Sequence, residues 1–176
     1  ATAAAVAGTA HAQVRVVNQA ISEAEVIAAQ QAWCQALTDI SAAHDNGGQP
    51  AAKALAEKVI DAAYGYQMGA VLFKPTLTTN PQTFRTTRAG ALAYFVGGDA
   101  AFPKDTGFAL KGWRKCEVAN AAIFIAGDSA TTMGKVNITG KDGKVTTVDK
   151  TWKFVKDDAG RLRIVVHHSS LEYAGT

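Results

Sequence analysis

The chain has 176 residues, 48% of them hydrophobic, which suits one well-buried core and leaves too few residues for two. The formal net charge is +3, and the basic residues are scattered with no stripe interleaved with aromatics, which argues against a nucleic-acid partner. No run reaches the roughly 18 apolar residues that a membrane helix requires, so no membrane partner is predicted.

The first residues are small and uncharged and end in Ala-His-Ala before Gln13, as the cleavage sites of secretory signals do. We interpret residues 1–12 as the remnant of a bacterial export signal, which predicts a periplasmic or secreted protein, or else as a disordered leader. Residues 13–176 are expected to form one domain. In an oxidising compartment Cys34 and Cys116 can pair, although two cysteines alone do not establish a disulfide.

Two helices are predicted next. Ser22 and Glu25 have the spacing of a capping box, and apolar residues recur at helical intervals through residues 26–40. The first helix is expected to end near "HDNGG", and a second to run from Pro50 to about Gly65.

The segment "AVLFKPTL" indicates a short strand that Pro75 interrupts, which predicts an edge or bulged position and places Thr76 where the ladder ends. The following "RAGALAYFVGG" favours a short helix closed by Gly97 and Gly98.

From Gly107 onward the pattern changes to four strands separated by turns rich in glycine and aspartate: "FALKGWRKCEVANAAIFIAG", "SATTMGKVNITG", "VTTVDKTWKFVK" and "RLRIVVHHSS". Helices followed by an antiparallel meander predict an α+β fold. A curved antiparallel sheet wrapped around the long N-terminal helix would enclose a conical pocket.

The last strand ends in a doublet of histidines followed by a doublet of serines. Because side chains alternate along a strand, His167 and Ser169 share one face while His168 and Ser170 share the other. The two histidines therefore cannot bind one metal without a bulge. The strand either runs out into a polar loop or supplies a histidine and a hydroxyl to a pocket. Residues 162, 164 and 166 form the more apolar face of the strand. Strict alternation puts Ser170 on that same face, toward the core, unless the strand is bulged.

Metal and serine-nucleophile chemistry have little support in the sequence. His11, His44, the histidine doublet and two separated cysteines form no ligand cluster. A serine two residues from its base on one strand lacks the sharp turn that presents a nucleophile. What remains is a set of hydroxyls on Thr76, Tyr94, Ser169 and Ser170. They are candidates for a site only if the fold brings them together.

The blocks "VLFKPTL", "ALAYFVGGD", "GFALKGW" and "HHSSLEY", in this order, resemble the iota-class carbonic anhydrases. These are a branch of the calcium/calmodulin-dependent kinase II association-domain-like proteins, and the resemblance covers about residues 22–173. The wider fold resembles that of nuclear transport factor 2, in which a curved sheet cradles a long helix. The resemblance therefore implies a nuclear transport factor 2-like, cone-shaped fold.

The resemblance implies reversible hydration of carbon dioxide to bicarbonate with no metal cofactor, and the sequence leaves open whether a metal ion, a possibility for some relatives, takes part. The family residues that contact bicarbonate correspond to Thr76, Tyr94 and Ser169, with Ser170 as the alternative pocket hydroxyl. His167 shares the face of Ser169. With an ordinary pKa near 6.5, it is the expected proton relay, through Ser169 or a water.

Two other readings stay open at this point. Isomerases and dehydratases of the same fold place a carboxylate opposite a tyrosine in a roomy pocket, so an Asp or Glu facing Tyr94 would favour them. A non-catalytic association module would have its pocket filled by side chains. Every reading is compatible with a homodimer or a larger homo-oligomer, because the open face of such a sheet commonly packs against another copy.

Overall fold

The structure is a computed structural model that describes residues 12–175. Apart from residue 12, the predicted export-signal remnant lies outside these described residues. Within them, no helix is both long and apolar enough to cross a membrane.

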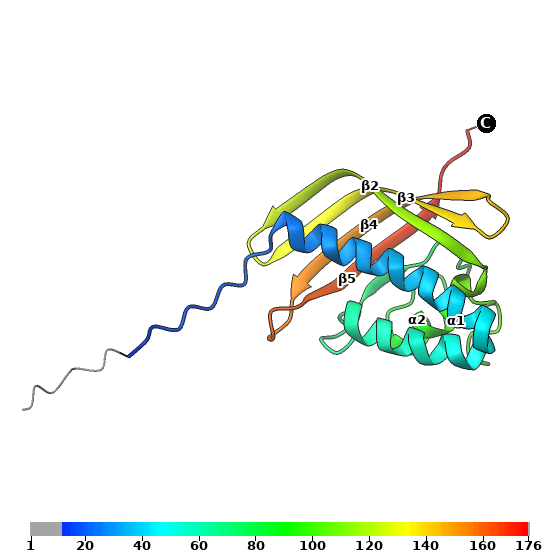
Figure 1. The fold of residues 1–176 in the computed structure, drawn as a ribbon, viewed down its shortest axis with the longest axis horizontal. Helices are drawn as coiled ribbons and strands as arrows, with labels where there is room; N and C mark the ends of the chain where they lie inside the picture. The colour runs from blue at the N-terminus through cyan, green and yellow to red at the C-terminus, as the bar shows by residue number, and fades with distance from the viewer. Residues whose placement is uncertain (1–11, 176) are drawn as a thin grey trace, which may run out of the picture.

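The helix α1 (Glu23–Ala63) opens the fold and is broken once. Its N-terminus carries the predicted capping box, in which Ser22 Oγ accepts from the backbone of Glu25 at 3.2 Å and Glu25 Oε2 accepts from the backbone of Ser22 at 2.8 Å. Gly48 leaves the helical conformation with φ of 71°, in the left-handed region that favours glycine. The two limbs on either side fold into a helical hairpin against the sheet (Figure 1) and correspond to the two predicted helices.

The sheet has five strands in the order β1-β5-β4-β3-β2. Their bounds are β1 Leu72–Lys74, β2 Trp113–Ala126, β3 Ser129–Gly140, β4 Val145–Lys156 and β5 Leu162–Leu171. The α+β class is confirmed and β2 to β5 form the predicted antiparallel meander, but β1 pairs with β5 in parallel, so the sheet is mixed. As its proline indicated, β1 is an edge strand.

Two short helical segments cover the end of the sheet near β1. The predicted helix α2 (Arg88–Val96) is present, and Gly97 follows it with φ of 62°. The strand predicted from "FALKGW" starts later, at Trp113, because Phe108–Leu110 form the 3-10 turn η1. The indole Nε1 of Trp113 donates to the carbonyl of Phe108 at 2.7 Å, which holds this turn against the core.

A bulge in β2 bends the sheet over α1. The pairing of β2 with β3 shifts between Asn120 and Ala122, opposite Gly134. A Cβ on Gly134 would lie 2.3 Å from the carbonyl oxygen of Ala119, so only glycine permits this close approach. The buried amide of Gln30 on α1 exchanges two hydrogen bonds with Asn120, at 2.9 and 2.7 Å, and fixes the helix to the bend.

A second bulge lies in β5 and decides which face of the HHSS motif points inward. Ile164 pairs with Phe154 while Val166 pairs with the adjacent Lys153, so Val165 is the extra residue. Beyond the bulge, His167 and Ser169 are buried on the same side as Ile164. The bulge therefore reconciles the apolar parity of residues 162–166 with an inward Ser169.

Candidate active site

A small cavity lies between the sheet, the first limb of α1, α2 and η1. Its walls are mostly aromatic, with three hydroxyls, one histidine and one lysine among the lining residues Trp33, Phe73, Pro75, Thr76, Tyr94, Phe95, Phe108, Lys150, His167 and Ser169. The free volume is about 10 Å³, close to the space that one water molecule needs. No Asp or Glu stands among the described residues that line it. The cavity thus has room for about one water molecule in this structure and none for a ring-sized ligand.

The three hydroxyls that the sequence singled out converge in this cavity. Thr76 follows the end of β1, and its Oγ1 lies 2.6 Å from Ser169 Oγ on β5. The hydroxyl of Tyr94 on α2 accepts from the backbone N–H of Leu77 at 3.3 Å, next to Thr76. Burial raises the pKa of Tyr94 above its ordinary value, so its hydroxyl is a donor and acceptor of hydrogen bonds rather than a base at neutral pH.

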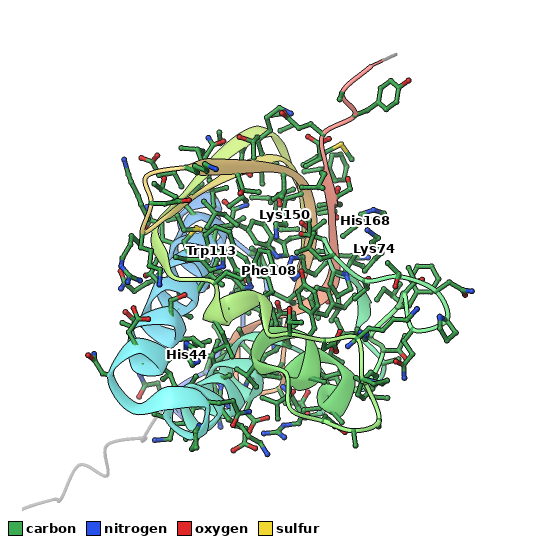
Figure 2. All side chains as sticks on the ribbon, turned by 90° about the vertical axis from the view of Figure 1, so that its right-hand side faces the viewer. His44, Lys74, Phe108, Trp113, Lys150 and His168 are labelled. Carbon is green, nitrogen blue, oxygen red and sulfur yellow. A yellow bond between two sulfur atoms is a disulfide. The ribbon has the colours of Figure 1, made fainter. Side chains whose placement is uncertain are left out.

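The structure does not bring Ser170 into the cavity. Ser170 and His168 lie on the opposite face of β5, where they line a shallow outer depression, and Figure 2 shows His168 and Lys74 on that outer side. His44 lies in the last turns of the first limb, among partly exposed residues. Of the hydroxyls weighed from the sequence, Ser169 and not Ser170 is the one that faces Thr76.

His167 is fully enclosed and makes two hydrogen bonds, neither of them to Ser169. Its Nδ1 lies 2.8 Å from the hydroxyl of Tyr64, and its Nε2 lies 2.9 Å from Nζ of Lys150. Burial, together with the nearby Lys150 and His168, lowers the pKa of His167 well below 6.5. The ring is therefore uncharged at neutral pH and a weaker base than its ordinary pKa suggested.

Three residues that surround His167 were not predicted from the sequence as parts of a site. Tyr64 is the C-cap of α1, Trp33 donates its indole N–H to the Tyr64 hydroxyl at 3.0 Å, and Lys150 enters from β4. A signal for Lys150 was present in "VDKTWKF", where it occupies the same parity as the apolar Val148, Trp152 and Phe154. That parity faces inward, and all four residues are buried.

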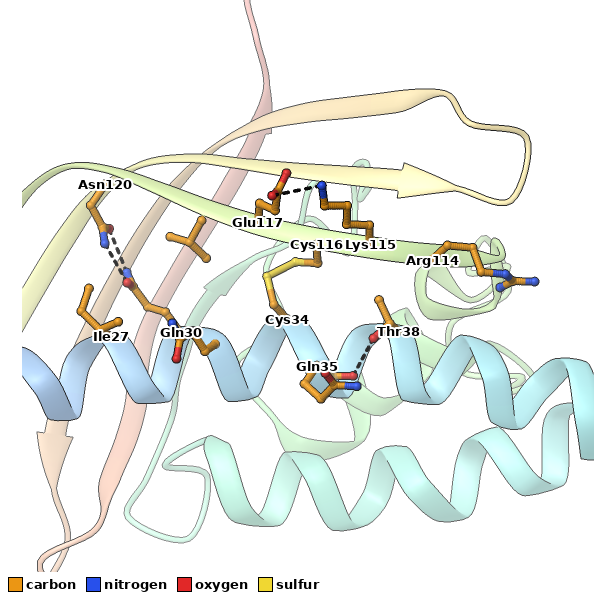
Figure 3. Close-up of a pocket in the computed structure, with 12 residues that line it drawn as sticks. Ile27, Gln30, Cys34, Gln35, Thr38, Arg114, Lys115, Cys116, Glu117 and Asn120 are labelled. Carbon is orange, nitrogen blue, oxygen red and sulfur yellow. Dashed lines mark hydrogen bonds and ion pairs between the residues drawn. A yellow bond between two sulfur atoms is a disulfide. The ribbon is translucent and has the colours of Figure 1, made fainter.

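A wider groove of about 540 Å³ lies elsewhere, between α1 and β2 (Figure 3). Cys34 and Cys116 face each other across it and form a disulfide, with Cα atoms 5.2 Å apart, so the pairing left open by the sequence is present. None of the hydroxyls named above lines this groove. Its size alone does not make it the site, because its lining offers no converging set of hydroxyls.

No group of three His, Cys, Asp or Glu side chains within residues 12–175 is placed to hold a metal ion. The chemically distinctive part of the structure is therefore the buried set of hydroxyls, histidine and lysine around the small cavity.

This fold and cavity define a class of α+β protein in which a curved sheet and a long helix enclose a small, hydroxyl-lined cavity. The family model for metal-independent carbonic anhydrase matches residues 24–171, and the chain belongs to that family.

Individual relatives agree with this assignment. A metal-independent carbonic anhydrase from Nostoc sp. is 69% identical over 158 residues, which cover 90% of this chain and 77% of the relative. The crystal structure of an iota-carbonic anhydrase from a cyanobacterium, complexed with bicarbonate, is 66% identical with a TM-score of 0.90. The match covers 93% of this chain and all of that one. A calcium/calmodulin-dependent protein kinase II association domain from Xanthomonas campestris shares the fold alone, at 23% identity, a TM-score of 0.55, and coverage of 95% of this chain and 100% of that one.

The resemblance read from the sequence is confirmed, and the chain is a carbonic anhydrase that acts on a small molecule. The family is described as metal-independent, which agrees with the expectation of no metal cofactor.

Proposed function

We propose that this carbonic anhydrase converts carbon dioxide and water into bicarbonate within the cavity bounded by Thr76, Tyr94 and Ser169. The observation that carries the proposal is the convergence of these three hydroxyls, from a loop, a helix and a strand, on one enclosed space. Hydroxyls serve here because each both donates and accepts, so the set can orient a water and then meet the carbonate oxygens as they become negative.

The aromatic walls complete the arrangement. Carbon dioxide is apolar and uncharged, and Phe73, Phe95 and Phe108 offer it a surface without competing polar groups. Holding the gas beside an oriented water replaces an encounter in solution by a fixed geometry. The lack of a lining carboxylate and the small volume favour neither an isomerase nor a dehydratase for ring substrates.

We assign His167 a positioning role rather than that of the base expected from its ordinary pKa. Both ring nitrogens are engaged, by Tyr64 and by Lys150, and the lowered pKa keeps the ring neutral. Stacking on Phe73, with ring centroids 4.5 Å apart, fixes the ring in the cavity wall.

The test is stopped-flow hydration of carbon dioxide by protein stripped of metal, with Tyr94→Phe, Ser169→Ala and Ser170→Ala beside the wild type. We expect Tyr94→Phe and Ser169→Ala each to lower kcat/KM by about a hundredfold, the usual cost of removing a donor aimed at a developing oxyanion. Ser170→Ala should keep the wild-type rate because its side chain is on the outer face. A loss confined to Ser170→Ala would refute the assignment of the cavity.

We further propose that the protein is exported to the periplasm or secreted. The disulfide supports this, because such bonds persist in oxidising compartments and are rare in the cytosol. Recovery of the native protein from the cytosolic fraction with both thiols reduced would contradict it.

We also propose a homodimer or larger homo-oligomer. Helices cover one face of the sheet, whereas the outer face carries the exposed Met133 beside polar side chains and β2 is an unpaired edge. Sedimentation equilibrium that returned the 18.4 kDa mass of one chain would refute association.

A further inference from the structure

Within residues 12–175, Lys150 is a buried lysine that has no carboxylate partner. The residue is 5% exposed, and the ion pairs of the described residues, taken to 4.0 Å, include none with Lys150. Its Nζ lies 2.9 Å from His167 Nε2 at the cavity wall. Figure 2 places it inside the fold, on the helix side of the sheet. An unpaired buried amine costs stability, and an apolar residue would fill the same space without that cost, which points to a chemical use.

We propose that Lys150 takes up the proton that water releases on attacking carbon dioxide, and that the resulting ammonium pairs with the bicarbonate formed. This inference rests on the proposed function of the cavity. In the step, a bond forms between the water oxygen and the carbon, and one electron pair of a C=O bond moves onto its oxygen. One O–H bond of the water breaks and its proton goes to Nζ. A neutral amine, water and a neutral gas thus become an ammonium and a monoanion.

The other titratable groups that face Lys150 are poor candidates for this step. Burial raises the pKa of both Tyr64 on α1 and Tyr94 on α2, and His167 on β5 has its pKa lowered. Lys74 on β1 donates to the carbonyl of Ser169 at 3.2 Å and does not line the cavity. Burial lowers the pKa of Lys150 to about 7, so the neutral base is the main form above that pH.

The hydrogen bonds allow Lys150 to change charge without rearranging its neighbours. In the His167 tautomer that carries the ring proton on Nδ1, Nζ can donate an N–H to Nε2 in either charge state of Lys150. The lone pair of the neutral amine is then free to accept a proton. Once formed, the ammonium lies 4.4 Å from the ring centroid of Trp33 and 5.3 Å from that of Trp152, a favourable cation–π position.

The negative charge of the product is a second argument for a lysine at position 150. Bicarbonate is an anion, and among the lining residues only Lys150 can become a cation at neutral pH, since His167 stays neutral. Enclosing an anion without a counter-charge is costly, and protonation of Lys150 supplies the counter-charge in the step that creates the anion.

The decisive experiment is calorimetric titration of bicarbonate into the protein at about pH 8, in two buffers of different ionisation enthalpy. Because Lys150 is mostly neutral there and must be charged in the complex, the wild type should take up about one proton per bicarbonate bound. Lys150→Met, which keeps the chain length and loses the amine, should bind more weakly and take up none. Lys153→Met, on the same strand but the opposite face, should behave as the wild type. Equal proton uptake in wild type and Lys150→Met would overturn the proposal.

Kinetics separate this inference from the proposed function. We expect Lys150→Met to lower the hydration rate at least about a hundredfold, as loss of a general base does. It should also remove the rise in rate as the pH increases through about 7. A wild type that did not hydrate carbon dioxide would refute the function itself. An active wild type matched by Lys150→Met would refute only the role of Lys150. Should Lys150→Met fail to fold, carbon-13 NMR of lysine Cε in the wild type decides, because absence of any lysine titrating near neutral pH would overturn the proposal.

Discussion

A Cys34→Ser/Cys116→Ser double variant is expected to lose about 4 kcal/mol of unfolding free energy. The two cysteines are 82 residues apart in the sequence, so the disulfide closes a long loop that contains the part of α1 after Cys34, β1 and α2. Closing a loop of that length removes many conformations from the unfolded chain, which is the main source of the stabilisation. Urea denaturation followed by tryptophan fluorescence measures the difference.

Reduction of the wild type provides the matched control for this variant. Treatment with a strong thiol reductant should reproduce the same loss, and the reductant should leave the double variant unchanged. Because the disulfide spans the groove between α1 and β2 (Figure 3) and not the cavity, the hydration rate of the folded variant should be unaltered at a temperature where it remains folded. A stability loss under about 1 kcal/mol would contradict the loop-closure argument.

Asp105→Asn is expected to cost about 3–5 kcal/mol, because it leaves a buried guanidinium without its counter-charge. The side chains of Arg85 and Asp105 are 3% and 7% exposed and are joined by two hydrogen bonds. Arg85 also donates to the carbonyls of Gln82 and Gly90, and its backbone N–H bonds Phe73 of β1 at 2.8 Å. It therefore connects the strand that precedes Thr76 with the helix that carries Tyr94.

A double variant without either charge distinguishes the lost ion pair from simple loss of packing. Arg85→Met/Asp105→Leu removes both charges, so it should be more stable than Asp105→Asn, since breaking a buried pair costs more than replacing it. Thermal unfolding by circular dichroism gives the comparison. Single and double variants that lost equal stability would show that the charge pair itself contributes nothing.

Local chemistry predicted the elements whose ends are set by nearby residues. Ser22 and Glu25 mark the start of α1, Gly48 its break, and Pro75 the end of an edge strand, because capping, left-handed backbone and a missing N–H act within a few residues. The parallel pairing of β1 with β5 could not be read this way, since it joins Phe73 to His167 across most of the chain.

The sequence pointed to three hydroxyls that line the cavity and gave no prediction for the lysine that lines it too, for a related reason. Thr76, Tyr94 and Ser169 were found by resemblance, and nothing in their spacing shows that they converge. Lys150 was passed over because a lone lysine in a strand usually points to solvent, and only its parity with Trp152 indicated otherwise. Strict alternation likewise favoured Ser170, because no local pattern announces the extra residue at Val165.

The extra residue at Val165 sets which face of β5 points inward, and it also sets how far along the strand the inward residues lie. If β5 continued its pairing without the bulge, His168 would stand opposite Lys150 and Ser170 opposite Val148, whereas His167 now stands opposite Trp152 and Ser169 opposite Lys150. The inward histidine and serine would have the same chemistry but would lie two rungs further along the ladder, about 7 Å away. Ser169 and Thr76, now 2.6 Å apart, would have no equivalent contact. The doublets HH and SS alone therefore do not determine where along β5 the inward histidine and serine lie. The one extra residue at Val165 determines that position.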